Sequence, residues 1–300
     1  MRAALEEDAG DLGDVTTVAT IAQGTQAAAE FLAKADGVLA GVAVADAVAA
    51  AVDPELHVVW FARDGERVIK GQTLGEWRGD ARAILVAERV ALNFLQRMSG
   101  VATAAAEMAA AAKPAVVLDT RKTAPGLRLL DKWAVKIGGA RPHRIGLYDY
   151  LMIKDNHIAA AGGMREALQA AEAHLGASGL SLGIEVEART LEEVDQVIAL
   201  HKDYPHLQRV MLDNMVVKDA SKPGGADVSM LREALGMLQQ AGCQLETEAS
   251  GNVTLETAAA IGATGVQFVS VGALTHSVKA MDISLNIVLQ QGEGEMEAVQ

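Results

Sequence analysis

The chain has 300 residues, half of them hydrophobic, and a formal net charge of -13 at pH 7. Its length suits one large α/β domain or two smaller ones, and its acidity argues against binding a nucleic acid or an anionic membrane. The single cysteine, Cys243, excludes an internal disulfide framework and a cysteine-cluster metal site.

The chain also lacks the sequence patterns of membrane insertion and export. No apolar run approaches the roughly 18 residues that a membrane span requires. The acidic start, MRAALEEDAGDLGDVTT, has neither a signal-peptide pattern nor an Arg/Ser-rich transit pattern. We therefore expect a soluble intracellular protein, or a mature form whose leader has been removed.

The N-terminal third has a mixed pattern that differs from the rest of the chain. Residues 29–49 alternate strand-like pieces with a helix, and residues 57–79 predict strands around tight turns. The Ala-rich stretch 81–112 is apolar at helical spacing, which predicts one or two buried helices with a break at Ser99-Gly100.

One pattern in this part of the chain has two interpretations. RDGERVIKGQTL, within residues 63–75, contains a DGxxVxxGQ pattern that also occurs in lipoyl- and biotinyl-type carrier folds. Such carriers need a modifiable lysine at the tip of a turn, and Lys70 is the lysine within the pattern. We favour a structural β-turn and keep the non-enzymatic carrier module as an alternative.

A regular rhythm begins near residue 113. Helical segments such as MREALQAAEAHL, TLEEVDQVIALH and MLREALGMLQQAG separate successive strand-like runs. Strands and helices alternating at this spacing predict parallel βα units, and six in a row favour a closed or nearly closed barrel over a doubly wound open sheet. The six runs are AVVLDTRK, YLMIKDNH, LGIEVEAR, RVMLDNM, CQLETEAS and GVQFVSVG.

Every one of these runs is apolar early and polar late. The carboxyl ends of the strands in a βα barrel converge on the active site, so six segments are expected to deliver polar groups to one rim. Lys154 is expected to face this shared pocket. The late residues are Asp119, Thr120, Arg121, Lys122, Lys154, Asp155, Glu185, Glu187, Asp213, Asn214, Glu246, Glu248, Ser250, Ser270 and Gly272.

Positive charge is concentrated in one part of this acidic chain. Residues 113–154 hold nine Lys/Arg and three acids, a net charge of +6. A solvated basic helix would explain Arg128, Lys132 and Lys136 without a ligand. It would not explain the cations at strand ends, where burial is costly without an anionic partner. These cations, Arg121, Lys122 and Lys154, predict a pocket for a small polyanion.

Glycine motifs and carboxylates complete the predicted pocket. EASGN and SVG each follow a late strand and precede a helix, so their backbone N–H groups could form a phosphate cradle. Glu187 and Asp213 could hold Mg²⁺ that is bound mainly to substrate, or bind ribose hydroxyls directly. For Glu185, pairing with a rim lysine remains an alternative to a role in the site.

Eight motifs in this order carry a family resemblance: AERVALNFLQRMSGVAT, DTRKTAPGLR, HRIGLYD, IKDNH, EVE, LDN, EASGN and SVGALTHS. They resemble the quinolinate phosphoribosyltransferase family (nicotinate-nucleotide pyrophosphorylase, carboxylating). The similarity runs from EEDAG to ALTHSVKAMDISL, nearly the whole chain, and DKWAV and TEASGNVTLET are closest to plant-type members.

The resemblance implies a reaction and an architecture. Quinolinate and phosphoribosyl pyrophosphate would give nicotinate mononucleotide, pyrophosphate and CO₂, with Mg²⁺ as cofactor, in NAD biosynthesis. The fold would be α/β: an N-terminal α/β sandwich (1–112, with 276–300 packing back on it) and an incomplete, open β/α barrel of the type II phosphoribosyltransferase kind (113–275). The protein would be a homodimer, and a plant-type mature chain would lie in the plastid stroma rather than the cytoplasm.

The resemblance also assigns roles to single residues. Arg97 would reach into the neighbouring subunit's site, and Lys122, Lys154, Glu187 and Asp213 would be catalytic. Ala140 and Pro142 depart from the family's usual glycine and asparagine, so the loop before His143 is expected to be stiffer or shifted. The substrate-binding residues would be Arg97, Thr120, Arg121, Lys122, His143, Arg144, Lys154, Glu187 and Asp213, and the phosphate-binding residues Ser250, Gly251, Asn252, Ser270, Val271 and Gly272.

Two other enzyme functions remain as alternatives. A Schiff-base aldolase barrel would use Lys154 as its nucleophile. A phosphoribosyltransferase that takes nicotinate would share the pocket but release no CO₂. Borohydride trapping on Lys154 would identify the first, and the absence of CO₂ release the second.

Overall fold

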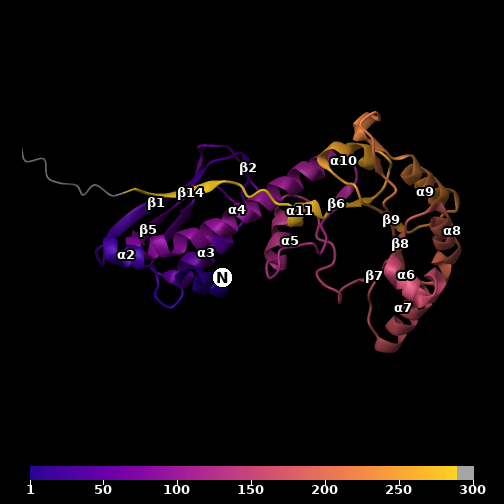
Figure 1. The fold of residues 1–300 in the computed structure, drawn as a ribbon, viewed down its shortest axis with the longest axis horizontal. Coiled ribbons are helices and arrows are strands. Elements are labelled where there is room, and N and C mark those ends of the chain that lie inside the picture. The colour runs from indigo at the N-terminus through magenta and orange to yellow at the C-terminus, as the bar shows by residue number, and fades with distance from the viewer. Residues whose placement is uncertain (289–300) are drawn as a thin grey trace, which may run out of the picture. The chain divides into compact units, whose positions relative to one another are not determined.

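The computed structural model describes residues 1–288, and its internal contacts divide the chain into two compact units (Figure 1). One unit contains Met1–Thr103 with the chain from Val278 onward, and the other contains Ala104–Ser277. The two units divide at residues 103/104, within the long helix Ala81–Ala111. The boundary expected at 112/113 lies just after the end of that helix. Within residues 1–288, no helix has the length and apolar composition needed to cross a membrane.

The first unit is built around a four-stranded antiparallel sheet in the order β14-β1-β5-β3. Apolar residues of β1 face its core, where the ring of Phe31 packs against Trp60 and Trp77 at centroid distances of 4.8 and 4.9 Å. The strands are β1 (Gln26–Ala33), β3 (His57–Trp60), β5 (Thr73–Asp80) and β14 (Ile283–Val288); the helices are α1 (Arg2–Ala9), α2 (Val15–Thr20) and α3 (Val42–Val52).

Two short strands, β2 (Gly37–Val38) and β4 (Arg67–Val68), form a separate pair beside this sheet. The DGxxVxxGQ segment supplies β4 and the turns around it. The backbone N–H of Lys70 donates a hydrogen bond of 2.8 Å to Asp36, and Gly71 has a φ of 90° that suits a glycine in a tight turn. The segment therefore has the geometry of a structural turn.

Helix α4 (Ala81–Ala111) is continuous, so the break predicted at Ser99-Gly100 is wrong. These small residues serve close packing instead. The Ser99 hydroxyl accepts the Ala40 N–H at 2.9 Å, and a Cβ on Gly100 would lie 2.4 Å from the Lys279 carbonyl oxygen. The sequence signal that indicated a helix end came from a contact with a distant segment of the same unit.

The second unit contains a six-stranded parallel sheet in the order β6-β13-β12-β9-β8-β7. All six predicted strands are present. In the described part of the chain β6 and β7 are the two ends of this sheet, so the barrel is open rather than closed. The strands are β6 (Val116–Leu118), β7 (Leu151–Ile153), β8 (Ile184–Ala188), β9 (Leu207–Asp213), β12 (Glu246–Ser250) and β13 (Phe268–Ser270).

Helices α7, α8 and α9 follow one another along one side of this sheet (Figure 1). Between β9 and α9 the chain makes a small hairpin, β10 (Val217–Lys218) and β11 (Ala226–Asp227), with a 3-10 turn at Pro223–Gly225. The helices are α5 (Arg128–Ile137), α6 (Asp155–Ala161), α7 (Met164–Ser178), α8 (Leu191–Leu200), α9 (Ser229–Gln240), α10 (Leu255–Gly262) and α11 (Ala273–His276); a 3-10 turn at His201–Asp203 follows α8.

Strand β8 shows how the sheet presents its polar residues. All five of its residues are buried, as expected where helices cover one face and the barrel interior the other. Because side chains alternate along a strand, Ile184, Val186 and Ala188 share one face and Glu185 and Glu187 the other. The interior face is therefore polar, and its carboxyl end forms the site.

The packing of α4 gives a first prediction. Gly100→Ala should lower the free energy of unfolding by about 1–3 kcal/mol, because the new methyl group meets backbone atoms that cannot move aside. Gly176→Ala, in α7, is the matched control: no atom lies within 4 Å of the added Cβ, so helix propensity should make it neutral or stabilising by up to about 1 kcal/mol. Denaturant unfolding of both variants checks this, and equal effects would contradict it.

Candidate active site

An inner cavity of about 220 Å³ lies within the second unit, where the parallel strands end. It combines cationic side chains with two methionines, so it offers both charge and an apolar wall. Its lining residues are Asp119, Thr120, Arg121, Lys122, His143, Arg144, Met152, Lys154, Met211, Glu248, Ser250 and Ser270.

A wider outer cavity of about 560 Å³ adjoins the inner one and shares five lining residues with it: Thr120, Lys122, Lys154, Ser250 and Ser270. The outer cavity adds the carboxylates Glu187 and Asp213 and both glycine motifs. Every residue that the resemblance assigned to the site from Thr120 to Gly272 lines one of the two cavities, whereas Glu185 and Glu246, also expected at the rim, line neither. Arg97 differs, because it lies on α4 in the first unit, and its role in a neighbouring site stays a prediction.

Two guanidinium groups face the inner cavity. Arg121 follows β6, and its buried Nε has no hydrogen-bond partner among residues 1–288. Arg144 donates a hydrogen bond of 3.2 Å to the Tyr150 carbonyl. Burial, and then the nearby charge of Arg121, lower the pKa of Arg144. Two neighbouring, half-buried cations with unused donor capacity indicate a site for an anion.

A buried ion pair, Asp119 with Lys132, lies next to the two segments that carry these cations. Lys132 of α5 is 2% exposed, and its Nζ lies 2.5 Å from the Oδ1 of Asp119, which is fully buried. The same Oδ1 accepts the backbone N–H of His143 at 2.7 Å. The solvated-helix interpretation is therefore wrong for Lys132, whereas Lys136 on the same helix is exposed.

The segment before His143 is tied to the edge of the sheet. The Arg141 N–H donates to the Val117 carbonyl at 2.9 Å, and the Asp119 N–H donates to the Arg141 carbonyl at 3.1 Å. Pro142 lies between these bonds and the His143 N–H, at a position where no donor is needed. Its missing N–H therefore leaves the loop's hydrogen bonds intact.

Deeper in the barrel, His143 lies between two buried carboxylates. Its Nε2 is 3.1 Å from Glu185 and 3.2 Å from Glu248. Arg209 of β9 contributes a second cation, 3.1 Å from Glu248, and lies over the ring of Phe268 at 4.2 Å. Glu185 therefore pairs with a histidine, not with the rim lysine that the alternative had suggested.

The protonation of this cluster follows from its geometry. Burial alone would lower the pKa of His143, but Glu185 and Glu248 outweigh burial and raise that pKa to about 9. Burial raises the pKa of Glu185, whereas for Glu248 the hydrogen bonds of His143 and Ser270 overcome burial and lower the pKa. The Arg144 N–H points at the Nδ1 of His143 at 2.7 Å, a contact that an imidazolium ring must give up.

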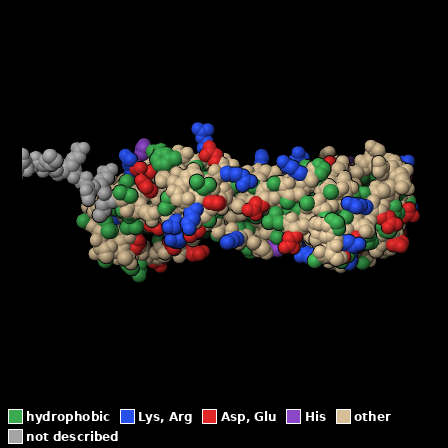
Figure 2. Space-filling view, turned by 90° about the horizontal axis from the view of Figure 1, so that it is seen from above, with side chains coloured by type: hydrophobic (Ala, Val, Ile, Leu, Met, Phe, Trp, Pro, Cys, Tyr) green, Lys and Arg blue, Asp and Glu red, His purple; other side chains and the backbone are tan. Residues whose placement is uncertain are grey.

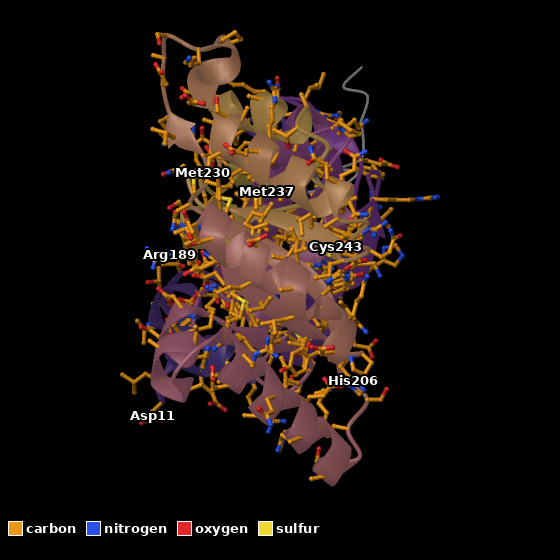
Figure 3. All side chains as sticks on the ribbon, turned by 90° about the vertical axis from the view of Figure 1, so that its right-hand side faces the viewer. Asp11, Arg189, His206, Met230, Met237 and Cys243 are labelled. Carbon is orange, nitrogen blue, oxygen red and sulfur yellow. The ribbon has the colours of Figure 1, made fainter. Side chains whose placement is uncertain are left out.

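Lys154, at the end of β7, faces the pocket as expected. Its Nζ lies 2.9 Å from Glu187 and 3.7 Å from the sulfur of Met211. The neighbouring polar residues have other roles: His157 accepts the Lys154 N–H in a capping interaction, and Asp155 pairs with Arg189 at 3.0 Å. Arg189 points outward from the second unit (Figure 3).

The two glycine motifs bring backbone close to other parts of the site. A Cβ on Gly251 would lie 2.3 Å from the Asn214 side chain, and one on Gly272 would lie 2.9 Å from Lys122. Asn214 and Asn252 both have a φ of 57°, a left-handed conformation that asparagine tolerates. The loops after β9, β12 and β13 therefore form one cradle that larger residues would fill.

The described residues offer two groups that could hold a cation. Glu187 and Asp213 lie on the open outer cavity, and two carboxylates at neighbouring strand ends fit a Mg²⁺ ion held mainly by substrate oxygens. His143, Glu185 and Glu248 place their ligand atoms within 4.8 Å of one another, but this group suits Mg²⁺ poorly. Mg²⁺ prefers oxygen ligands to the nitrogen of a histidine, and the Arg209 cation already pairs with the Glu248 carboxylate.

Four lining residues of the inner cavity were given no binding role from the sequence: Asp119 and Glu248, which were expected only at the rim, and Met152 and Met211, which were not expected at all. The period-two alternation of strands would have found three of them. Met152 precedes Lys154 by two residues, Met211 precedes Asp213, and Glu248 precedes Ser250, so each shares its partner's face.

Known proteins are similar to this chain in sequence and in fold. The family model described as the quinolinate phosphoribosyl transferase N-terminal domain matches residues 14–99, and the model of the C-terminal domain matches residues 101–286. A mitochondrial quinolinate phosphoribosyltransferase (decarboxylating) of Nicotiana tabacum is 56% identical over 96% of this chain and 81% of its own length. A probable nicotinate-nucleotide pyrophosphorylase (carboxylating) of Bacillus subtilis is 38% identical over 94% and 90%.

The solved structure of NadC from Streptococcus pyogenes matches with a TM-score of 0.83 and 34% identity over 96% of both chains. By its fold and site, this protein belongs to the class of open parallel β/α barrels with a pocket of cationic side chains at the strand ends. Within that class, the chain belongs to the quinolinate phosphoribosyltransferase family, since both family models and these relatives cover nearly its whole length.

The His143 cluster gives a prediction that NMR can test. The ring of His143 should titrate with a pKa of about 9. Glu248→Gln should move that pKa toward the ordinary value of about 6.5, because it removes one of the two carboxylates. The chain has seven histidines, so His143→Gln identifies the signal.

The same cluster should affect stability in a defined pH window. A raised pKa stabilises the folded state fully below about pH 6.5, and the contribution is lost as the pH rises through about 9. An ordinary titration near 6.5 in the unmodified protein would contradict the assignment.

Proposed function

We propose that this protein transfers the phosphoribosyl group of phosphoribosyl pyrophosphate to quinolinate and removes CO₂, which gives nicotinate mononucleotide for NAD biosynthesis. The observation that carries the proposal is the pair of guanidiniums, Arg121 and Arg144, with an unused buried donor in a cavity that opens onto two glycine loops. A dicarboxylate suits the first feature, and a phosphorylated sugar suits the second. The names of the relatives support both substrates.

In this proposal the inner cavity binds quinolinate. Arg121 and Arg144 bind its two carboxylates, since guanidinium groups bind carboxylates in bidentate fashion. Met152 and Met211 supply an apolar wall for the pyridine ring, and thioether sulfurs pack favourably on aromatic rings. His143, whose Nε2 lies between Glu185 and Glu248, contributes positive charge. As an imidazolium it gives up the contact with the Arg144 N–H, so its Nδ1–H becomes a free donor beside the cavity.

The outer cavity binds phosphoribosyl pyrophosphate. The loops at 250–252 and 270–272 hold the 5′-phosphate with backbone N–H groups, and Lys122 and Lys154 face the pyrophosphate. Glu187 and Asp213 would hold Mg²⁺, which would supply positive charge to offset the negative charge of the leaving pyrophosphate.

The reaction consists of two bond exchanges. The ring nitrogen bonds to the ribose carbon as the bond to pyrophosphate breaks, and Glu187 and Asp213 stabilise the positive charge that develops on the sugar. The ring carbon next to the now-cationic nitrogen then loses CO₂, keeps the electron pair and takes a proton from water. The protein's contribution is therefore placement of charge rather than covalent catalysis.

We propose a homodimer in which Arg97 reaches the neighbouring site. An exposed apolar group on the second unit supports an interface: Leu129 is 73%, Leu147 72% and Tyr148 72% exposed, and Trp133 is 39% exposed. Leu129 and Trp133 lie one turn apart on α5, and Leu147 and Tyr148 are adjacent in the chain; exposed apolar side chains of this size fit a contact with another chain. On the face shown in Figure 2, acidic and basic side chains are interspersed, which does not resemble a nucleic-acid surface.

The compartment is also part of the proposal. The relatives include one named as mitochondrial, from Nicotiana tabacum, and one named as chloroplastic, from Arabidopsis thaliana. We propose the plastid stroma or the cytoplasm for this chain. Imaging of a fluorescent fusion of the complete gene would distinguish them.

One assay tests the central proposal. The purified protein with Mg²⁺, quinolinate and phosphoribosyl pyrophosphate should form nicotinate mononucleotide and release one CO₂ for each product molecule. Product formation from nicotinate without CO₂ release would favour the nicotinate-specific alternative instead. Lack of product from both acids would contradict the proposed function.

Arg121→Ala should lower kcat/KM for quinolinate roughly ten- to a hundredfold or more, because one charge-assisted contact of about 1.5–3 kcal/mol is lost. Arg232→Ala is the matched control, since Arg232 is exposed on α9 and lines neither cavity. The control should retain near-normal kinetics. An Arg121→Ala enzyme with the same kinetics as the control would remove Arg121 from the proposed site.

The dimer proposal predicts complementation between two inactive variants. An Arg97→Ala subunit damages its neighbour's site, and a Lys154→Ala subunit damages its own. A mixed dimer therefore has one site with both defects and one intact site. Random mixing makes half of the dimers hybrid, so refolding the two together should recover roughly a quarter of the activity. Hybrid dimers confirmed by native mass spectrometry but lacking activity would show that Arg97 does not serve the neighbouring site.

A further inference from the structure

We propose that the buried ion pair of Asp119 and Lys132 is a positioning device for quinolinate: it sets the cations of the inner cavity and leaves the binding of phosphoribosyl pyrophosphate unaffected. The inference rests on the proposed function. It concerns residues that lie behind the predicted binding groups, and Lys132 lines neither cavity.

The pair is buried more completely than an ordinary ion pair. The Lys132 side chain is 2% exposed and that of Asp119 is 0% exposed, with 2.5 Å between Nζ and Oδ1. Two buried charges are costly to desolvate, and a pair of apolar residues would hold a helix against a strand as well or better. The presence of two buried charges at this position therefore points to a role other than stabilising the fold.

Asp119 joins the two segments that carry Arg121 and Arg144, and it ties both to helix α5. It directly precedes Thr120 and Arg121 at the end of β6. Its Oδ1 accepts the backbone N–H of His143, which fixes the start of the segment that carries Arg144. Lys132 reaches the same place from α5 and also lies 3.4 Å from the His143 carbonyl. One carboxylate therefore sets the spacing between Arg121 and Arg144.

The position of the pair also affects the field in the cavity. Asp119 lines the inner cavity, where a negative charge would repel a dicarboxylate. Lys132 neutralises that charge from the side away from the cavity. The pair thus lets a carboxylate organise an anion site without opposing the anion.

The phosphate side of the site has separate anchors. The Asn214 N–H donates to Ser250 at 2.9 Å, and the Asn252 side chain donates to Val216 at 2.9 Å. The backbone carbonyl of Lys122 accepts a hydrogen bond from Thr275 at 2.8 Å. Because these contacts do not involve Asp119 or Lys132, loss of the pair should affect quinolinate and spare phosphoribosyl pyrophosphate.

The test is a double-mutant cycle with steady-state kinetics for both substrates. Lys132→Met and Asp119→Asn should each raise the KM for quinolinate at least tenfold and leave the KM for phosphoribosyl pyrophosphate within threefold. The double variant should be little worse than the worse single variant, because the two side chains act as one unit. Lys132→Arg, which keeps the charge, should recover part of the loss, and Lys136→Met, on the exposed side of α5, should behave as the unmodified enzyme.

Thermal unfolding of each variant separates positioning from stability. Asp119→Asn keeps the shape and the acceptor oxygen, so it tests the proposal even if Lys132→Met does not fold. Equal losses for both substrates, or multiplicative losses in the double variant, would overturn the proposal. An unmodified enzyme without activity would instead contradict the proposed function, so the two failures can be told apart.

Discussion

The cations of the inner cavity can lie close together because buried carboxylates lie directly behind them. Asp119 holds the segments of Arg121 and Arg144, and Glu185 and Glu248 lie against His143. Asp119 is paired with Lys132 and Glu248 with Arg209, two cations that line neither cavity. Alternating layers of charge therefore replace the apolar filling that barrel interiors usually have.

This layering explains why the interior of the sheet holds charged residues well below the rim, among apolar ones such as Met211 and Phe268. A pocket for a polyanion needs several like charges within a few ångströms, and each would be unstable in a medium of low polarity on its own. Opposite charges placed one layer deeper stabilise them while leaving their free donors directed outward. The strand register supplies the spacing, since every second residue returns to the same face.

Much of the fold could be predicted from the sequence because its signals are local. The six parallel strands follow from apolar runs with polar ends, and the order of the helices follows from their periodicity. The continuity of α4 could not be predicted, because Ser99 and Gly100 are small for the sake of segments far along the chain. The open edge of the barrel likewise depends on long-range strand pairing. Only the family resemblance indicated that the barrel would be open.

The site was predictable where a residue ends a strand, and less so one layer deeper. Lys132 has the spacing of a surface helix residue, and only the structure reveals that its partner is Asp119. Arg209 and Glu248 lie early or midway in their strands, where a charge gives no local sign of its partner. Their roles depend on contacts between different strands, which periodicity along one strand cannot supply.

The open edge of the barrel has a consequence for how such a site can change. Arg141 runs beside Leu118 at the edge of β6, through a single bridge rather than a full strand ladder. The segment that carries His143 and Arg144 thus occupies the gap in the barrel, whereas the phosphate loops follow strands inside the sheet. Substitutions or length changes in that segment leave every strand pair intact. Evolution or engineering could therefore exchange the acid acceptor at the gap while the phosphoribosyl half of the site stays constant.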